Sequence, residues 1–175
     1  SNQTFACTGI VLHSRDGATI TGRTIDWANA ETNNIYAITP RGHEIKSMLP
    51  DGTQNGLKFT AKYGFVGLGP ERPEFIVDGI NEMGLNAELF YFPDYGQYLP
   101  YDEGMRDMSL ADLQVVSWIL ANFATIDEVQ QNIDNVRIIG VEPGSSTTHW
   151  RISEPNGRVV IARSEERRVG KECRS

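Results

Sequence analysis

Alternating apolar and polar residues in the first part of the chain predict β-strands rather than helices. Residues 8–13 and 18–24 are rich in β-branched side chains and flank the pair Asp16-Gly17, which suits a tight turn. These runs predict an antiparallel hairpin whose first strand begins just after Cys7. Further runs of this kind predict strands over residues 34–39, 57–68, 75–77 and 86–92.

The apolar residues then change to a helical period. They recur at the spacing of one helix face over residues 110–123, and Ser109 and Asp112 suit a capping box at the start of that helix. A second capping box, Thr125 and Glu128, predicts another helix directly afterwards.

Strands return at the far end of this pattern. Residues 147–152 and 158–161 flank Pro155-Asn156-Gly157, whose Asn-Gly pair predicts a second hairpin. The order of strands, helices and strands predicts an α+β fold.

Composition narrows the classes of protein that the chain could represent. Its 175 residues are 39% hydrophobic and 22% charged, which is typical of one globular domain. The net charge of −7, without a basic stripe carrying aromatic side chains, argues against a nucleic-acid partner. We expect no membrane span, because no apolar run is long enough, and no metal or cofactor, because His149 has no partner at ligand spacing.

The composition changes abruptly near the C-terminus. Residues 163–175 are dominated by charged side chains and resemble the translation of sequencing-adaptor DNA. We therefore expect 163–175 to be a non-native tail, and 7–162 to be the natural domain sequence. Residues 1–6 are interpreted as a leader, a propeptide or a cloning remnant, which leaves a periplasmic, secreted or cytoplasmic location open.

Cys7 is the residue with the clearest chemical use. If the residues before Cys7 are removed, its own α-amino group becomes free. A group of this type has a pKa of about 7.7 to 8.0, so it can accept the thiol proton. The predicted hairpin would return Arg23 and Asp26 to the neighbourhood of that amine and thiol. A small buried cysteine of structural use is the alternative from the residues alone.

With Cys7, Arg23 and Asp26 at this spacing, the chain resembles the choloylglycine hydrolase family, which includes bile salt hydrolases and penicillin V acylases. The resemblance implies an N-terminal-nucleophile hydrolase fold, an αββα sandwich that is truncated here. It also implies that Cys7 is the N-terminal nucleophile. Five blocks of sequence resemble the family in the same order: residues 7–27, 60–69, 77–85, 118–129 and 148–161.

The resemblance also implies roles for other residues. Arg23 would favour the thiolate of Cys7, and Asp26 would hold its α-amino group. Tyr91 would lie at the oxyanion and substrate edge. Asn81 is a second candidate for that edge, but it belongs to the turn Asn81-Glu82-Met83-Gly84-Leu85, and turn formation is its preferred interpretation. A later asparagine and arginine of the family's active site would lie beyond residue 162, so we expect this chain by itself to be inactive.

The expected partner is a small amide: a conjugated bile salt, penicillin V or an N-acyl homoserine lactone. A homo-oligomer of the full-length protein stays open. Two other functions stay open as well, a non-catalytic β-rich binding domain with a structural Cys7, and an N-acyl amidase similar to acid ceramidase.

Overall fold

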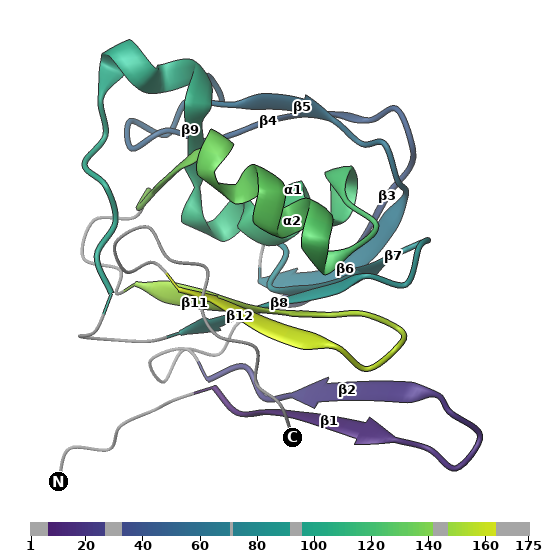
Figure 1. The fold of residues 1–175 in the computed structure, drawn as a ribbon. Coiled ribbons are helices and arrows are strands. Elements are labelled where there is room, and N and C mark those ends of the chain that lie inside the picture. The colour runs from purple at the N-terminus through teal and green to yellow at the C-terminus, as the bar shows by residue number, and fades with distance from the viewer. Residues whose placement is uncertain (1–6, 27–32, 71, 92–95, 142–146, 164–175) are drawn as a thin grey trace, which may run out of the picture.

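In the part of the chain that the structure describes, six antiparallel strands form the main sheet, in the order β12-β11-β8-β7-β6-β3 (Figure 1). The structure is a computed structural model, and it describes residues 7–26, 33–70, 72–91, 96–141 and 147–163. The strands of this sheet are β3 (Asn34–Thr39), β6 (Phe65–Pro70), β7 (Asp78–Asn81), β8 (Asn86–Tyr91), β11 (Thr148–Ser153) and β12 (Val159–Arg163).

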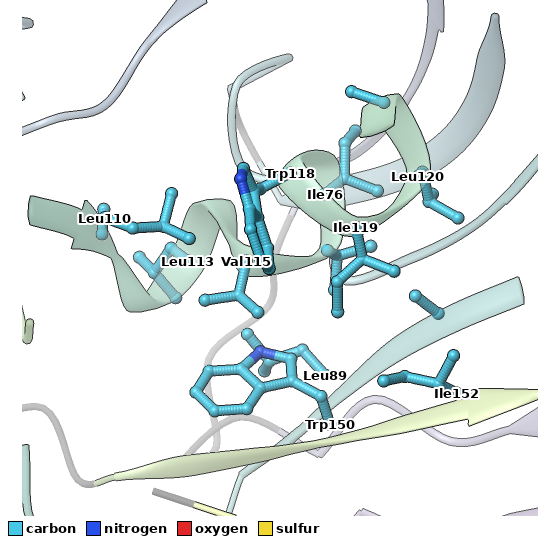
Figure 2. Close-up of a cluster of buried hydrophobic side chains, with 14 of the residues drawn as sticks. Ile76, Leu89, Leu110, Leu113, Val115, Trp118, Ile119, Leu120, Trp150 and Ile152 are labelled. Atoms are coloured by element: carbon cyan, nitrogen blue, oxygen red, sulfur yellow. The ribbon is translucent and has the colours of Figure 1, made fainter. Parts of the chain in front are cut away.

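Two short helices, α1 (Val115–Asn122) and α2 (Ile126–Asn132), cover one face of the sheet (Figure 1). Alternate residues of a strand point to the same face, so Leu89 of β8 and Trp150 and Ile152 of β11 can meet α1, whereas Phe90 points to the opposite face. Figure 2 shows Leu89, Trp150 and Ile152 of the sheet facing Val115 and Ile119 of the helix, and all five side chains are buried. This helix-on-sheet layer is the hydrophobic core.

A separate hairpin lies on the other side of the sheet. Strands β1 (Gly9–His13) and β2 (Thr19–Arg23) pair with each other from Gly9↔Arg23 to His13↔Thr19, and they form their own two-stranded sheet (Figure 1). The hairpin is therefore held to the six-stranded sheet by side chains rather than by a backbone ladder. The order of layers is helices, main sheet and hairpin.

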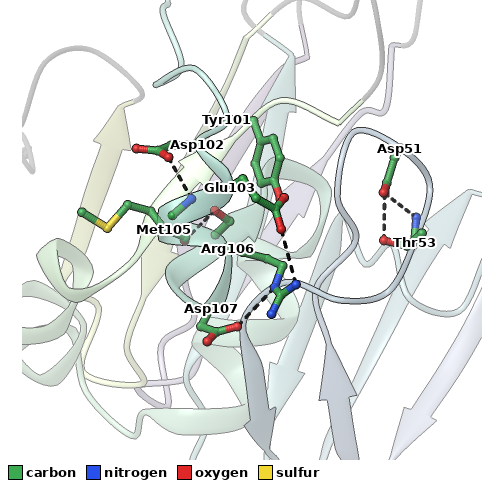
Figure 3. Close-up of polar contacts among 10 residues, drawn as sticks. Asp51, Thr53, Tyr101, Asp102, Glu103, Met105, Arg106 and Asp107 are labelled. Carbon is green, nitrogen blue, oxygen red and sulfur yellow. Dashed lines mark hydrogen bonds and ion pairs between the residues drawn. The ribbon is translucent and has the colours of Figure 1, made fainter.

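The remaining elements are short and lie outside the six-stranded sheet. Figure 3 shows the polar contacts there: Asp102 accepts a hydrogen bond from the Gly104 N–H at 2.9 Å, and Arg106 forms ion pairs with Glu103 and Asp107. The remaining elements are β4 (Glu44–Lys46), β5 (Lys58–Thr60), β9 (Ser109–Ala111), β10 (Arg137–Ile139) and the 3₁₀ helices η1 (Glu103–Met108), η2 (Asp112–Gln114) and η3 (Ile133–Asn135).

Both predicted hairpins are confirmed, and so is the strand at residues 34–39. The helix start predicted at Thr125 is also confirmed, because the Glu128 N–H donates to Thr125 Oγ1 at 3.2 Å. The reciprocal bond differs from a capping box: Glu128 Oε2 accepts from the Ala124 N–H at 2.7 Å, one residue before the N-cap. At both hairpins and at this helix start the decisive contacts are between near neighbours in the chain, which is why a local pattern was sufficient.

The capping box predicted at Ser109 and Asp112 is wrong. Ser109 begins strand β9, which pairs in parallel with β10, and α1 begins only at Val115. The apolar spacing of 110–123 is real, but its first residues are buried by pairing with a strand far along the chain.

Two strand predictions also need correction. Residues 57–68 form two strands, β5 and β6, instead of one. Residues 75–77 precede β7 and are buried without belonging to a strand, although Val77 is hydrogen-bonded to both Leu68 and Leu89. Their apolar character reflects burial in the core.

Some expectations fall on residues outside the described ranges. These are residues 1–6, Phe92 at the end of the strand predicted over 86–92, and residues 164–175 of the expected tail. Arg163, where that tail was expected to begin, is the last residue of β12 and pairs with His149. The non-native origin of the tail stays a prediction.

Candidate active site

Cys7 lies two residues before the start of β1, at the end of the hairpin opposite the Asp16-Gly17 turn. The ladder continues past the strand ends, because the Thr24 N–H donates to the Thr8 carbonyl at 2.9 Å and the Thr8 N–H donates to Thr24 Oγ1 at 3.1 Å. This pairing brings the half-buried Cys7 beside Asp26, and Cys7 Sγ lies 3.8 Å from the Asp26 carbonyl oxygen.

Asp26 meets Cys7 through its backbone, while its carboxylate is held within the hairpin. Thr24 Oγ1 donates to Asp26 Oδ2 at 2.9 Å, which fixes the direction of that side chain. The structure therefore brings Cys7 and Asp26 together, as the hairpin prediction required.

Arg23 ends β2 and points onto the main sheet. Its Nη1 donates to the Val77 carbonyl at 2.9 Å, its Nε donates to the Thr24 carbonyl at 3.3 Å, and its guanidinium carbon lies 4.8 Å from the centre of the Phe90 ring. An arginine over an aromatic face is attracted by the ring's quadrupole. Arg23 is thus a fixed positive charge at the same end of the hairpin as Cys7.

Tyr91 is the last residue of β8 and pairs with Thr148. Tyr91 follows Phe90, and the guanidinium of Arg23 lies over the Phe90 ring. Because Arg23 is at the Cys7 end of the hairpin, the end of β8 lies there as well. Tyr91 is half-buried and belongs to the same end of the sheet as Arg23.

Asn81 lies at the opposite end of β7 from Val77. Its Nδ2 donates to the Leu120 and Phe123 carbonyls at 3.0 and 2.7 Å, and its Oδ1 accepts from the Met83 and Leu85 N–H groups at 3.0 and 3.1 Å. The structure therefore does not bring Asn81 together with Cys7, and it places this side chain between the β7-β8 turn and α1.

Three charged residues beneath the hairpin were missed by the analysis of the sequence. Asp78, Glu88 and Arg151 are opposite one another on β7, β8 and β11, and Glu88 forms an ion pair with Arg151. The sequence does contain a sign of this ion pair: Glu88 and Arg151 are charged residues inside two otherwise mainly apolar strands, NAELFY and THWRIS.

Burial dominates the electrostatics of these two carboxyl groups. It raises the pKa of the Glu88 carboxyl above its usual value, opposed by the hydrogen bond and the charge of Arg151. Burial likewise raises the pKa of the Asp78 carboxyl, opposed mainly by the charge of Arg23. Arg23 and Arg151 therefore lie near one buried carboxyl group, that of Glu88, and one half-buried carboxyl group, that of Asp78.

Among the described residues, no group of three or more His, Cys, Asp or Glu side chains could hold a metal ion. None of the helices in the described ranges is long and apolar enough to cross a membrane.

The helices, the antiparallel sheet and the hairpin have the layered α+β arrangement of the N-terminal-nucleophile hydrolase fold. The family described as linear amide C-N hydrolases, choloylglycine hydrolase family, matches residues 7–170, and the chain belongs to it. This family comprises enzymes that hydrolyse carbon–nitrogen bonds of linear amides.

Individual relatives agree with this assignment. The chain is 30% identical over 170 residues to a bile salt hydrolase/transferase of Clostridium perfringens, covering 92% of this chain and 49% of the relative. It is 28% identical over 158 residues to a bile salt hydrolase/transferase of Bifidobacterium longum, covering 89% and 48%. The chain thus spans about half the length of the curated relatives that it matches.

Solved structures show the same fold. A mutant conjugated bile acid hydrolase from Clostridium perfringens superimposes with a TM-score of 0.75 and 27% identity, over 94% of this chain and 50% of that one. The penicillin V acylase from Agrobacterium tumefaciens gives a TM-score of 0.74 at 24% identity, over 94% and 47%. The fold is therefore the N-terminal-nucleophile hydrolase α+β fold, and this chain is truncated relative to those structures.

Proposed function

We propose that the protein to which this chain belongs hydrolyses the carbon–nitrogen bond of a linear amide with Cys7 as its N-terminal nucleophile. One observation carries the proposal: the Cys7 thiol lies at the open end of the hairpin, 3.8 Å from the Asp26 carbonyl. The guanidinium of Arg23 is anchored at the same end by Val77 and Phe90. Membership of the linear amide hydrolase family supports the reaction type.

The proposed reaction needs the α-amino group of Cys7, so residues 1–6 are removed first. The free amine accepts the thiol proton, and Sγ attacks the amide carbonyl carbon to form a tetrahedral intermediate. The protonated amine then gives its proton to the leaving nitrogen as the carbon–nitrogen bond breaks, which leaves a thioester. Water attacks the thioester, releases the acid and restores the thiol.

Asp26 and Arg23 have different proposed roles. The Asp26 carboxylate orients the ammonium form of the Cys7 amine by a charge-assisted hydrogen bond. Arg23 favours the thiolate, because a nearby positive charge stabilises a negative sulfur. Tyr91 lies at the substrate edge, while Asn81 is left out of the proposed site because its four hydrogen bonds are within the fold.

The proposed substrates are conjugated bile salts and penicillin V. The bile salt hydrolases and the penicillin V acylase among the similar proteins support these two amides. An N-acyl homoserine lactone has the same linear amide and is the third substrate to test.

The first test concerns processing and substrate. We expect the product of the complete gene to begin at Cys7, and to hydrolyse at least one of taurocholate, penicillin V and an N-acyl homoserine lactone. Intact-mass spectrometry reads the N-terminus, and amine release measured by ninhydrin or fluorescamine reads hydrolysis. A mature protein that begins at Ser1 and hydrolyses none of them would indicate a binding domain, and preference for a fatty acylethanolamide would indicate a ceramidase-like amidase.

We also propose that the 175-residue chain by itself does not catalyse this reaction. Tyr36 and Ile38 on β3 are each 83% exposed, and they lie beside Val66 on β6 and Ile80 on β7, which are 42% and 46% exposed. Thr21 of the hairpin lines the same groove, so this apolar face is on the hairpin side of the sheet. A contiguous apolar face of this kind is typical of a surface that another segment covers.

For the isolated chain we expect hydrolysis at least about 10³-fold slower than for the complete gene product, since loss of one oxyanion donor alone costs about 10²- to 10³-fold. The same chain should enhance the fluorescence of the apolar dye ANS, and replacing Tyr36 and Ile38 by Ser should reduce that enhancement. Hydrolysis by the isolated chain at the rate of the complete protein would show that the site needs nothing more.

A further inference from the structure

The hairpin that follows the proposed nucleophile is docked on the main sheet by side-chain contacts. Because β1 and β2 form their own two-stranded sheet, side chains must set its position. Thr19 Oγ1 donates to the Pro155 carbonyl at 3.0 Å near the turn, and Arg23 donates to the Val77 carbonyl at the Cys7 end. A third contact lies between them.

That contact is made by Arg151, Glu88 and Phe90, which we call the hairpin seat. Arg151 Nε donates to Glu88 Oε2, and the Arg151 guanidinium lies 5.3 Å from the centre of the Phe90 ring. Its Nη2 lies 3.5 Å from the Gly22 carbonyl of β2. Glu88 is fully buried and the Arg151 side chain is 9% exposed, so the guanidinium has little freedom to move.

Gly9 of β1 rests directly on this seat. A Cβ at this position would meet Arg151 Nη1 at 2.5 Å and the Phe90 ring at 2.7 Å, so the hairpin can approach this closely only because Gly9 has no side chain. Gly9 pairs with Arg23, and it is two residues from Cys7. The same Phe90 ring carries Arg23 on the hairpin side.

We propose that the hairpin seat positions Cys7 and Arg23, so that Arg151 and Glu88 are positioning residues of the reaction. The inference rests on the proposed role of Cys7. Arg151 is held by its ion pair with Glu88. Gly9 packs against Arg151, which fixes the distance between the main sheet and the start of β1, two residues after Cys7. A buried ion pair contributes little net stability compared with apolar residues of equal size, so a positioning use accounts for its presence better than stability does.

The test compares two glycines of one hairpin in the mature protein that begins at Cys7. Gly9→Ala inserts a methyl group into the seat, whereas Gly22→Ala, whose Cβ would meet only Ile10 Cγ1 at 3.6 Å, keeps its carbonyl and adds no clash. We expect Gly9→Ala to lower kcat by about 10- to 100-fold with KM changed less than about twofold, since a misplacement of about 1 Å can cost 10²-fold. We expect Gly22→Ala to stay within about twofold of the wild type in both constants.

Alkylation of Cys7 by iodoacetamide, followed by mass spectrometry of the Cys7 peptide, reports the position of the thiol without hydrolysis. Its rate should fall in Gly9→Ala and not in Gly22→Ala. Arg151→Lys shortens the side chain and keeps its charge, so adding Gly9→Ala to Arg151→Lys should cost less than adding it to the wild type. Near-ultraviolet circular dichroism shows that each variant is folded at the temperature of the assay.

The proposal is overturned if folded Gly9→Ala matches Gly22→Ala in both kcat and the alkylation rate, or if the effects of Gly9→Ala and Arg151→Lys multiply independently. Failure of the proposed function gives a different result. In that case Gly9→Ala still slows the alkylation of Cys7, but the Cys7→Ala variant still hydrolyses the amide.

Discussion

Replacing Cys7 by Ala abolishes amide hydrolysis in the complete protein, with kcat expected to fall by about 10⁴-fold or more. The physical reason is that the variant has no sulfur to form the thioester, while the rest of the site only binds and polarises the amide. Among the described residues, the hydrogen bond of Cys7 Sγ is the weak one to the Asp26 carbonyl at 3.8 Å, so removal of the sulfur should leave the fold intact. Amine release under single-turnover and steady-state conditions measures the effect.

Two further variants separate chemistry from structure. Cys7→Ser keeps the α-amino group and the shape of the side chain, so we expect it to be processed at the same bond. Because a hydroxyl is a weaker nucleophile than a thiol, the variant should hydrolyse amides at a small fraction of the wild-type rate. Arg15→Ala lies in the exposed turn of the same hairpin and should hydrolyse within about twofold of the wild type. Undiminished hydrolysis by folded Cys7→Ala would refute the nucleophile.

The second large effect is on stability, at Asn81. Its side chain is 4% exposed and satisfies the Leu120 and Phe123 carbonyls and the Met83 and Leu85 N–H groups. Asn81→Ala removes all four bonds at once. Since a buried backbone group left without its partner costs about 1–3 kcal/mol, we expect the free energy of unfolding to fall by about 2–5 kcal/mol. Urea unfolding followed by circular dichroism measures this change.

A matched asparagine provides the comparison. Asn135 is exposed and makes one side-chain contact, to Asn132 Oδ1 at 3.3 Å, so Asn135→Ala should change the free energy of unfolding by less than about 0.5 kcal/mol. If instead Asn81→Ala has the stability of the wild type and loses only substrate affinity, Asn81 belongs to the substrate edge after all.

The hairpin at the start of the chain illustrates what could be predicted. Asp16-Gly17 and the β-branched runs on either side specify it locally, and Gly17 has a φ of 89° as the turn requires. Once the hairpin is formed, the ladder must return residue 26 to residue 7. The proximity of Cys7 and Asp26 was therefore predictable before any tertiary contact was known.

The positions of Ser109 and Glu88 illustrate what could not. Ser109 has the local signature of a helix cap, but its neighbours are paired with β10, which lies more than twenty residues further along the chain. Glu88 resembles an exposed residue in an apolar strand, and it is fully buried because Arg151 lies opposite it on β11. Both outcomes depend on partners distant in the sequence.

The sequence by itself therefore determined the elements whose contacts are local, the hairpin that carries Cys7, and the resemblance that leads to the family. Only the tertiary structure decided that the Asn81 side chain connects β7 to the end of α1, and that Gly9 packs against Arg151 and Phe90. The reason is physical: turns and caps are set by neighbouring residues, whereas burial and ion pairing depend on which strands the fold brings side by side.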